Sequence, residues 1–195
     1  SVGINFANGF GEQPGALIRS RINASGCLGI NCVTSCQSTI TAISMSSVSA
    51  NSATVTFTDN VSTSWKYRLS KMDGTIISSG NTNSKVLNFS GLEPATYYRV
   101  FVGTDCSGPD AFTVKQLFLT DADWCSGILF TDNGGSTNNY TNNETIIKTF
   151  YPTNPNDKLK LTFTEFDTEA GYDFMNIYDG PTVSSPRFSG GTQLS

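Results

Sequence analysis

The sequence predicts a mainly β chain with two consecutive antiparallel β-sandwich modules, residues 37–120 and 121–195, preceded by a short helical segment within residues 1–36. Two observations predict this fold class. Apolar and polar residues alternate with period two, as in strands that bury one face and expose the other. Turn-forming clusters separate these runs at short intervals, which is typical of a sandwich and not of alternating strands and helices.

The composition excludes several kinds of site. None of the 195 residues is His, so the chain lacks the usual general base of a nucleophilic triad and the commonest zinc ligand. We therefore expect no catalytic residue in this chain. The formal net charge is −4 and no basic stripe is present, which argues against nucleic acid as a partner.

The chain also shows no membrane or export signal of its own. No apolar run approaches the ~20 residues that span a bilayer, and the first residues contain no signal peptide. The Ser-, Thr- and Asn-rich composition nevertheless favours a secreted, extracellular or cell-surface protein. We expect either that a signal has been removed or that the chain is an internal piece of a longer protein.

The only convincing helix lies at residues 12–23. Pro14 suits its first turn, and Arg19 and Arg21 lie toward its negative end. A single short helix cannot bury its own apolar face. Residues 1–36 are therefore expected to be the end of an upstream domain.

Three runs in residues 37–120 show the alternation clearly. In each run apolar residues occupy every second position, and we expect these to be buried while the residues between them face solvent. The expected core positions are Ala53, Val55, Phe57, Trp65, Tyr67, Leu69, Tyr98, Val100 and Val102.

The pattern Leu92-x-Pro94-x-Thr96-x-Tyr98-x3-Val102 resembles the E–F corner of a fibronectin type III domain. The resemblance covers residues 37–120 and implies a spacer or adhesion module. It also implies that Leu92, Pro94 and Tyr98 form a structural corner in which the Tyr hydroxyl bonds back to the backbone.

A second pattern lies in residues 121–195. Phe163-x-x-Phe166-Asp167-x-Glu169, followed by Tyr172-Asp173 and Ile177-Tyr178-Asp179-Gly180, resembles a CUB domain. The paired cysteines of animal CUB domains are absent, as in a bacterial version. Because the chain stops at Ser195, before the last strands of that family, we expect this module to be incomplete at its C-terminus.

Acidic residues crowd around one predicted turn of this module, and an oxygen-only cluster suits Ca²⁺. The CUB resemblance implies Glu169 and Asp173 as calcium ligands, with Asp167 a weaker candidate and a third carboxylate supplied from a later loop. Two alternatives stay open: solvated loop acids, and a glycosidase-like carboxylate pair.

Five cysteines, at positions 27, 32, 36, 106 and 125, predict disulfides more readily than a zinc site, because Cys32-x3-Cys36 has no second ligand pair. The fibronectin resemblance places Cys36 and Cys106 at the same end of the sandwich and implies a bond between them. Cys27 is expected to pair upstream of Ser1, and Cys32 and Cys125 are unassigned. A Cys32–Cys36 bond is the alternative.

The opening residues contain Gly3-Ile4-Asn5-Phe6, Gln13-Pro14-Gly15 and Cys27-Leu28, and they resemble the end of the catalytic domain of reprolysin-like zinc metallopeptidases from Bacteroidetes. This resemblance implies a metzincin-like upstream domain that holds Zn²⁺ outside this chain, and export by the type IX secretion machinery. The chain is then a non-catalytic accessory or binding region with an extracellular protein or glycan ligand. The alternative is an adhesin or matrix-binding protein without a catalytic domain.

Overall fold

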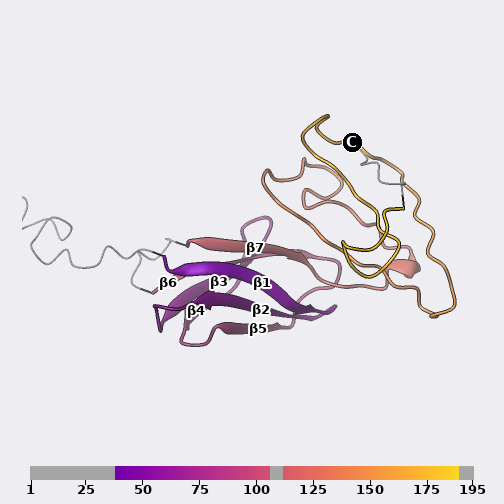
Figure 1. The fold of residues 1–195 in the computed structure, drawn as a ribbon. Helices are drawn as coiled ribbons and strands as arrows, with labels where there is room; N and C mark the ends of the chain where they lie inside the picture. The colour runs from indigo at the N-terminus through magenta and orange to yellow at the C-terminus, as the bar shows by residue number, and fades with distance from the viewer. Residues whose placement is uncertain (1–37, 106–111, 189–195) are drawn as a thin grey trace, which may run out of the picture.

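The computed structural model describes residues 38–105 and 112–188, and within these ranges the strands form two antiparallel sheets packed face to face (Figure 1). The first sheet has the order β1-β2-β5, with β1 at Ile40–Val48, β2 at Ser52–Asp59 and β5 at Val86–Ser90. The second has the order β4-β3-β6-β7, with β3 at Trp65–Lys71, β4 at Ile76–Thr82, β6 at Tyr97–Thr104 and β7 at Val114–Leu119. The mainly β, sandwich fold class is confirmed, and its strand order is fibronectin type III-like.

The core lies between the two sheets and follows the predicted alternation. On β2 and β6 the expected positions are buried, and the Trp65 ring meets Phe57 edge-on with centroids 5.2 Å apart. Tyr67 is only partly buried and packs against the edge of the core. Local period-two patterning therefore places nearly all of these side chains correctly.

The outer face of the second sheet is less solvated than the alternation predicts. Lys66, expected to face solvent, is only 7% exposed. Its amine lies 5.5 Å from the ring centroid of Phe112, which lies far along the sequence, just before β7. A pattern confined to β3 cannot reveal this contact, because Phe112 lies more than forty residues further along the chain, in the segment that leads into β7.

The connection after β7 is tied to the sandwich. Thr120 is fully buried; its hydroxyl donates to the Glu93 carbonyl at 2.7 Å and accepts from the Thr96 amide at 2.9 Å. The amide of Asp121 donates to the Ser49 carbonyl at 3.0 Å. The chain thus leaves the sandwich in a fixed direction.

Residues 121–188 run as an irregular chain beside the sandwich, the orange and yellow trace of Figure 1. In this described part they contain a 3-10 helix, η2 (Trp124–Ser126), and an isolated bridge between Tyr178 and Arg187. Leu159, Leu161 and Phe163 occupy alternate positions, as they would in a strand, but this stretch has no hydrogen-bonded neighbour and forms no strand. The CUB-like sandwich therefore stays a prediction.

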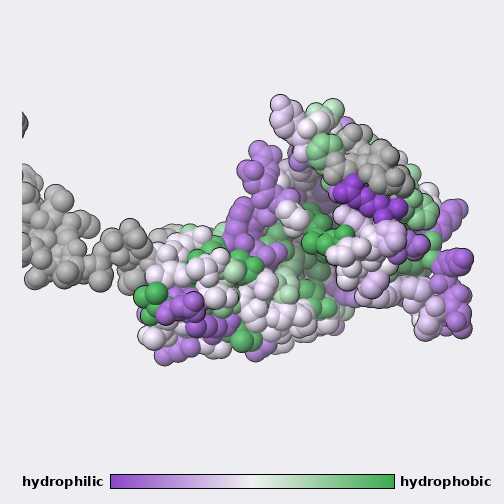
Figure 2. All heavy atoms as spheres, in the orientation of Figure 1, coloured by the Kyte–Doolittle hydropathy of each residue, from purple (hydrophilic) through white to green (hydrophobic). Residues whose placement is uncertain are grey.

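Apolar side chains gather where residues 121–188 approach the sandwich, the green atoms in the hollow of Figure 2. Others on this segment are exposed, including Phe163 and Tyr172. No helix in the described ranges combines the length and hydropathy needed to cross a membrane. The helix predicted at residues 12–23 lies outside the described residues.

Candidate interaction surface and predicted cation site

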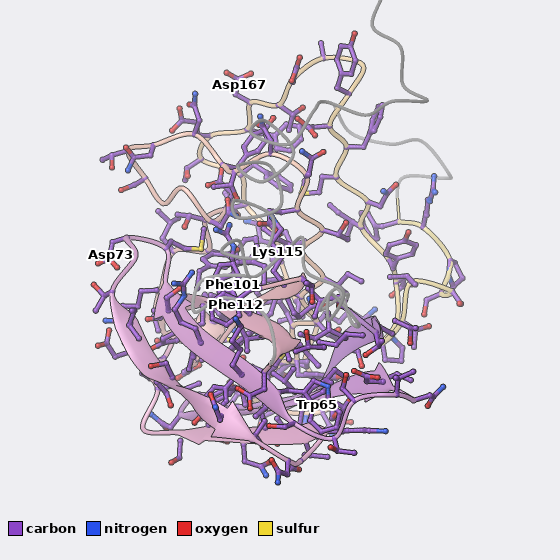
Figure 3. All side chains as sticks on the ribbon, turned by 90° about the vertical axis from the view of Figure 1, so that its left-hand side faces the viewer. Trp65, Asp73, Phe101, Phe112, Lys115 and Asp167 are labelled. Atoms are coloured by element: carbon purple, nitrogen blue, oxygen red, sulfur yellow. The ribbon has the colours of Figure 1, made fainter. Side chains whose placement is uncertain are left out.

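One face of the second sheet brings together cationic and aromatic side chains. The register pairs Arg68 of β3 with Phe101 of β6, and Phe101 with Lys115 of β7, so all three project from the same face. Phe112 lies next to them, with its ring centroid 5.8 Å from that of Phe101. Figure 3 shows the two rings and Lys115 close together. We call Lys66, Arg68, Phe101, Phe112 and Lys115 the cation–aromatic face.

The Arg68 guanidinium stacks on both rings, 4.9 Å from the centroid of Phe101 and 4.8 Å from that of Phe112. Each such contact contributes about 0.5–2 kcal/mol and restricts the rotamers of the Arg side chain. A partner would therefore meet a side chain that is already ordered. Arg and aromatic residues are enriched in protein interfaces, which makes this face a candidate interaction surface.

The residues of the predicted corner meet at the start of β6. The Tyr98 hydroxyl accepts a hydrogen bond from the Glu93 amide at 2.9 Å, and Leu92 is buried beside it. Pro94 and Ala95 make the turn, and Ala95 has a φ of +49°, a left-handed conformation that is strained for a residue with a Cβ. The corner holds β6 in register with the loop before it.

A buried carboxylate that sequence reasoning missed lies at the end of β2. Asp59 is fully buried and accepts hydrogen bonds from Trp65 Nε1 at 2.8 Å, Thr39 Oγ1 at 2.7 Å, and the amides of Val61 and Ser62 at 2.9 and 3.1 Å. Burial raises the pKa of Asp59, but these four bonds outweigh burial and hold its pKa far below the ordinary value. Asp59 is thus a charged structural group.

One signal in the sequence points to this arrangement. An Asp at a strand end often accepts from the amides two and three residues later, which forms an Asx turn. The bond from Trp65 could not be anticipated, because it depends on how β3 crosses the core.

The predicted calcium residues are only partly brought together. The Tyr140 hydroxyl donates to Asp173 Oδ2 at 2.7 Å and accepts from the Glu169 amide at 3.0 Å, so both residues meet at Tyr140. The hydrogen bond to Asp173 raises the pKa of Tyr140. Asp167 does not take part in this contact. Figure 3 shows it far from the cation–aromatic face.

The oxygen atoms of this stretch are of the kind that bind a hard cation, but in the described residues they do not converge on one point. Thr168 Oγ1 and Asn176 Oδ1, in the same stretch, are buried oxygens without a hydrogen-bond partner. Among the described residues, no three or more His, Cys, Asp or Glu side chains are placed to hold a metal. Calcium binding stays a prediction.

The predicted disulfide residues Cys36 and Cys106, like Cys27 and Cys32, lie outside the described residues. Cys125, in η2, is exposed and unbonded in the part of the chain described. The pairing of Cys36 with Cys106 also stays a prediction.

No protein-family model matches the chain, and no curated protein matches it. Solved structures with similar coordinates include the fn3 domain of human collagen alpha-1(XX) chain, at 18% identity over 46% of this chain and 94% of that one, with a TM-score of 0.37. The fn3 domain of human contactin 1 gives 16% identity, 50% and 92% coverage, and a TM-score of 0.36. The FN5 domain of Drosophila Lar is 12% identical over 43% of this chain and 95% of that one, with a TM-score of 0.33. The fold assignment rests on the strand order and register described above.

Proposed function

We propose that this chain is a non-catalytic binding and accessory region of a secreted multidomain protein. The observation that carries the proposal is the cation–aromatic face, where two rings hold Arg68 in a fixed orientation. Lys115, with 46% of its side chain exposed, opens this face to solvent. The composition, which contains no His, supports the same role.

The binding role is tested with immobilised heparin as a glycan probe and immobilised gelatin as a protein probe. Arg68→Gln is expected to weaken binding to the recognised probe about tenfold, because it removes the charge and both ring contacts. The matched control is Lys158→Gln, which changes an exposed cation outside the face. If the wild-type chain binds neither probe, or if both variants bind equally well, the face is not the binding surface.

For the parent protein, we propose a zinc metallopeptidase exported by type IX secretion, which acts outside the cell. The resemblance of residues 1–36 to the end of such a catalytic domain supports this proposal. The test is the full reading frame on both sides of the chain. An upstream H-E-x-x-H motif supports the peptidase, whereas further binding modules without that motif would identify an adhesin.

We also propose that Ca²⁺ binds beside Tyr140, through Glu169 and Asp173 and with Asp167 in a weaker role. The contacts of Tyr140 and the unpartnered oxygens of the same stretch support this site. Titration calorimetry of the chain, with its sequence extended past Ser195, should show binding that Asp173→Asn abolishes. Asp157→Asn, at an exposed acid, is the control. Absence of binding by the extended chain removes the site.

A further inference from the structure

Residues 121–150 contact the outer face of β6 and β7, and through Glu144 they reach Lys115 at the edge of the cation–aromatic face. The Tyr97 hydroxyl donates to the Thr131 carbonyl at 2.8 Å. Burial raises the pKa of Tyr97, and the Asp132 carboxylate adds to this effect. The segment is therefore joined to the sandwich through β6.

Glu144 is the centre of this contact. Its side chain is only 8% exposed, and its Oε1 lies 2.7 Å from Arg99 Nη2 and 3.1 Å from Lys115 Nζ. The two cations come from different strands, β6 and β7, so one carboxylate joins the segment to both. Arg99 also donates to Thr141 Oγ1 at 3.2 Å, which extends the network into the segment.

The segment that Glu144 anchors is a packed unit. The rings of Trp124, Phe130 and Phe150 meet edge-on, with centroids 5.2–5.9 Å apart. Lys148 lies over the Trp124 ring at 5.3 Å, and its Nζ is 2.9 Å from Asp121 Oδ1. The ring contacts join Trp124, Phe130 and Phe150 within the segment, although Phe130 is 40% exposed, so we expect the segment to move as a whole when its attachment opens.

We propose that Glu144 clamps residues 121–150 to β6 and β7, so that the sandwich and this segment move as one rigid body until the carboxylate is released. A carboxylate this deeply buried is destabilised when it loses a cationic partner. The Lys71–Glu93 pair has the same 2.7 Å distance, but the Glu93 side chain is 64% exposed, so water screens it. The clamp shares Lys115 with the cation–aromatic face, but it depends on neither the identity of a ligand nor the parent protein.

Limited digestion of the full 195-residue chain with trypsin tests the clamp. Cleavage after Lys148, whose side chain is 11% exposed, measures how often residues 121–150 detach from β6 and β7. Cleavage after exposed Lys160 of the same chain is the internal reference. The measured quantity is the rate of cleavage after Lys148 divided by that after Lys160. Glu144→Gln keeps the shape and removes the charge, and it is expected to raise this ratio about tenfold.

Two further variants make the test specific. Glu165→Gln makes the same change at an exposed acid and should leave the ratio unchanged. Lys115→Met removes the more exposed cation and should raise the ratio about threefold.

An unchanged ratio in Glu144→Gln overturns the proposal. New cleavage after buried Lys66 in step with Lys148 also overturns it, because Glu144 would then support the whole sandwich. If Glu144→Gln does not fold, Lys115→Met decides, and an unchanged ratio there overturns the clamp.

Discussion

Replacing Asp59 tests the account of the core most directly. Four hydrogen bonds to a charged acceptor contribute about 1.5–3 kcal/mol each, against a desolvation cost of several kcal/mol for the buried carboxylate. We expect Asp59→Ala to lower the free energy of unfolding by about 3 kcal/mol, or roughly 15 °C in the melting temperature of the sandwich. Asp59→Asn keeps the shape and one carbonyl oxygen, so about 2 kcal/mol is expected.

The assay is urea unfolding at pH 7, followed by the fluorescence of Trp65 in a Trp124→Phe background, which leaves a single Trp. Asp73→Asn, at an exposed acid of the same sandwich, is the control and should shift the midpoint little. If Asp59→Asn unfolds at the wild-type urea concentration, the assignment of Asp59 as a structural charge is refuted.

The pH dependence has a definite sign. Because the folded-state pKa of Asp59 is lowered, its contribution to stability is complete above the unfolded-state pKa of about 4 and is lost as the pH falls toward the folded-state pKa. Asp59→Asn should therefore lose less stability than the wild type between pH 5 and acid conditions.

Three further substitutions address the corner and the cysteines. Tyr98→Phe removes the acceptor of the Glu93 amide, and calorimetry should show a loss of about 1 kcal/mol. Ala95→Gly removes the strain of a Cβ at positive φ, which costs about 1–2 kcal/mol, and adds a backbone entropy cost of about 0.5–1 kcal/mol. A small rise in melting temperature is therefore expected. Peptide mapping without reductant should recover a Cys36–Cys106 bond, and Cys36→Ser should lower the free energy of unfolding by about 4 kcal/mol.

Each of these has a matched control. Tyr67→Phe removes a hydroxyl from a partly buried Tyr outside the corner and should change stability less than Tyr98→Phe. Gly74→Ala places a Cβ at a φ of +89° and should destabilise, the opposite of Ala95→Gly. Exposed Cys125 should react with iodoacetamide in the native chain, whereas equal labelling of Cys36 would contradict the disulfide.

The sandwich was predictable because the patterns that define its core and its corner lie within short stretches of sequence. Alternation on β2 and β6 identifies the buried face, and the corner motif identifies the turn before Tyr98. The cover over Lys66 and the ion pairs of Glu144 were not predictable, because they join residues far apart in sequence. Their geometry exists only once the sheet is assembled.

The CUB-like module predicted at residues 121–195 shows the opposite limit. Its sequence pattern predicts a strand through Leu159 and Leu161, yet residues 159–163 form none. A strand is a property of a pair, so a pattern of alternating residues predicts it only when a neighbouring strand is in place.

Two residues of β6, Tyr97 and Arg99, bond residues 121–150, and they differ in the kind of group they require on the other side. Tyr97 bonds a main-chain oxygen, which every amino acid supplies, so position 131 is free to vary while Tyr97 is kept. Arg99 bonds a side chain, so a change of sign at position 144 requires a compensating change at position 99. Divergent relatives should therefore show coupled substitution between positions 99 and 144, and none between positions 97 and 131.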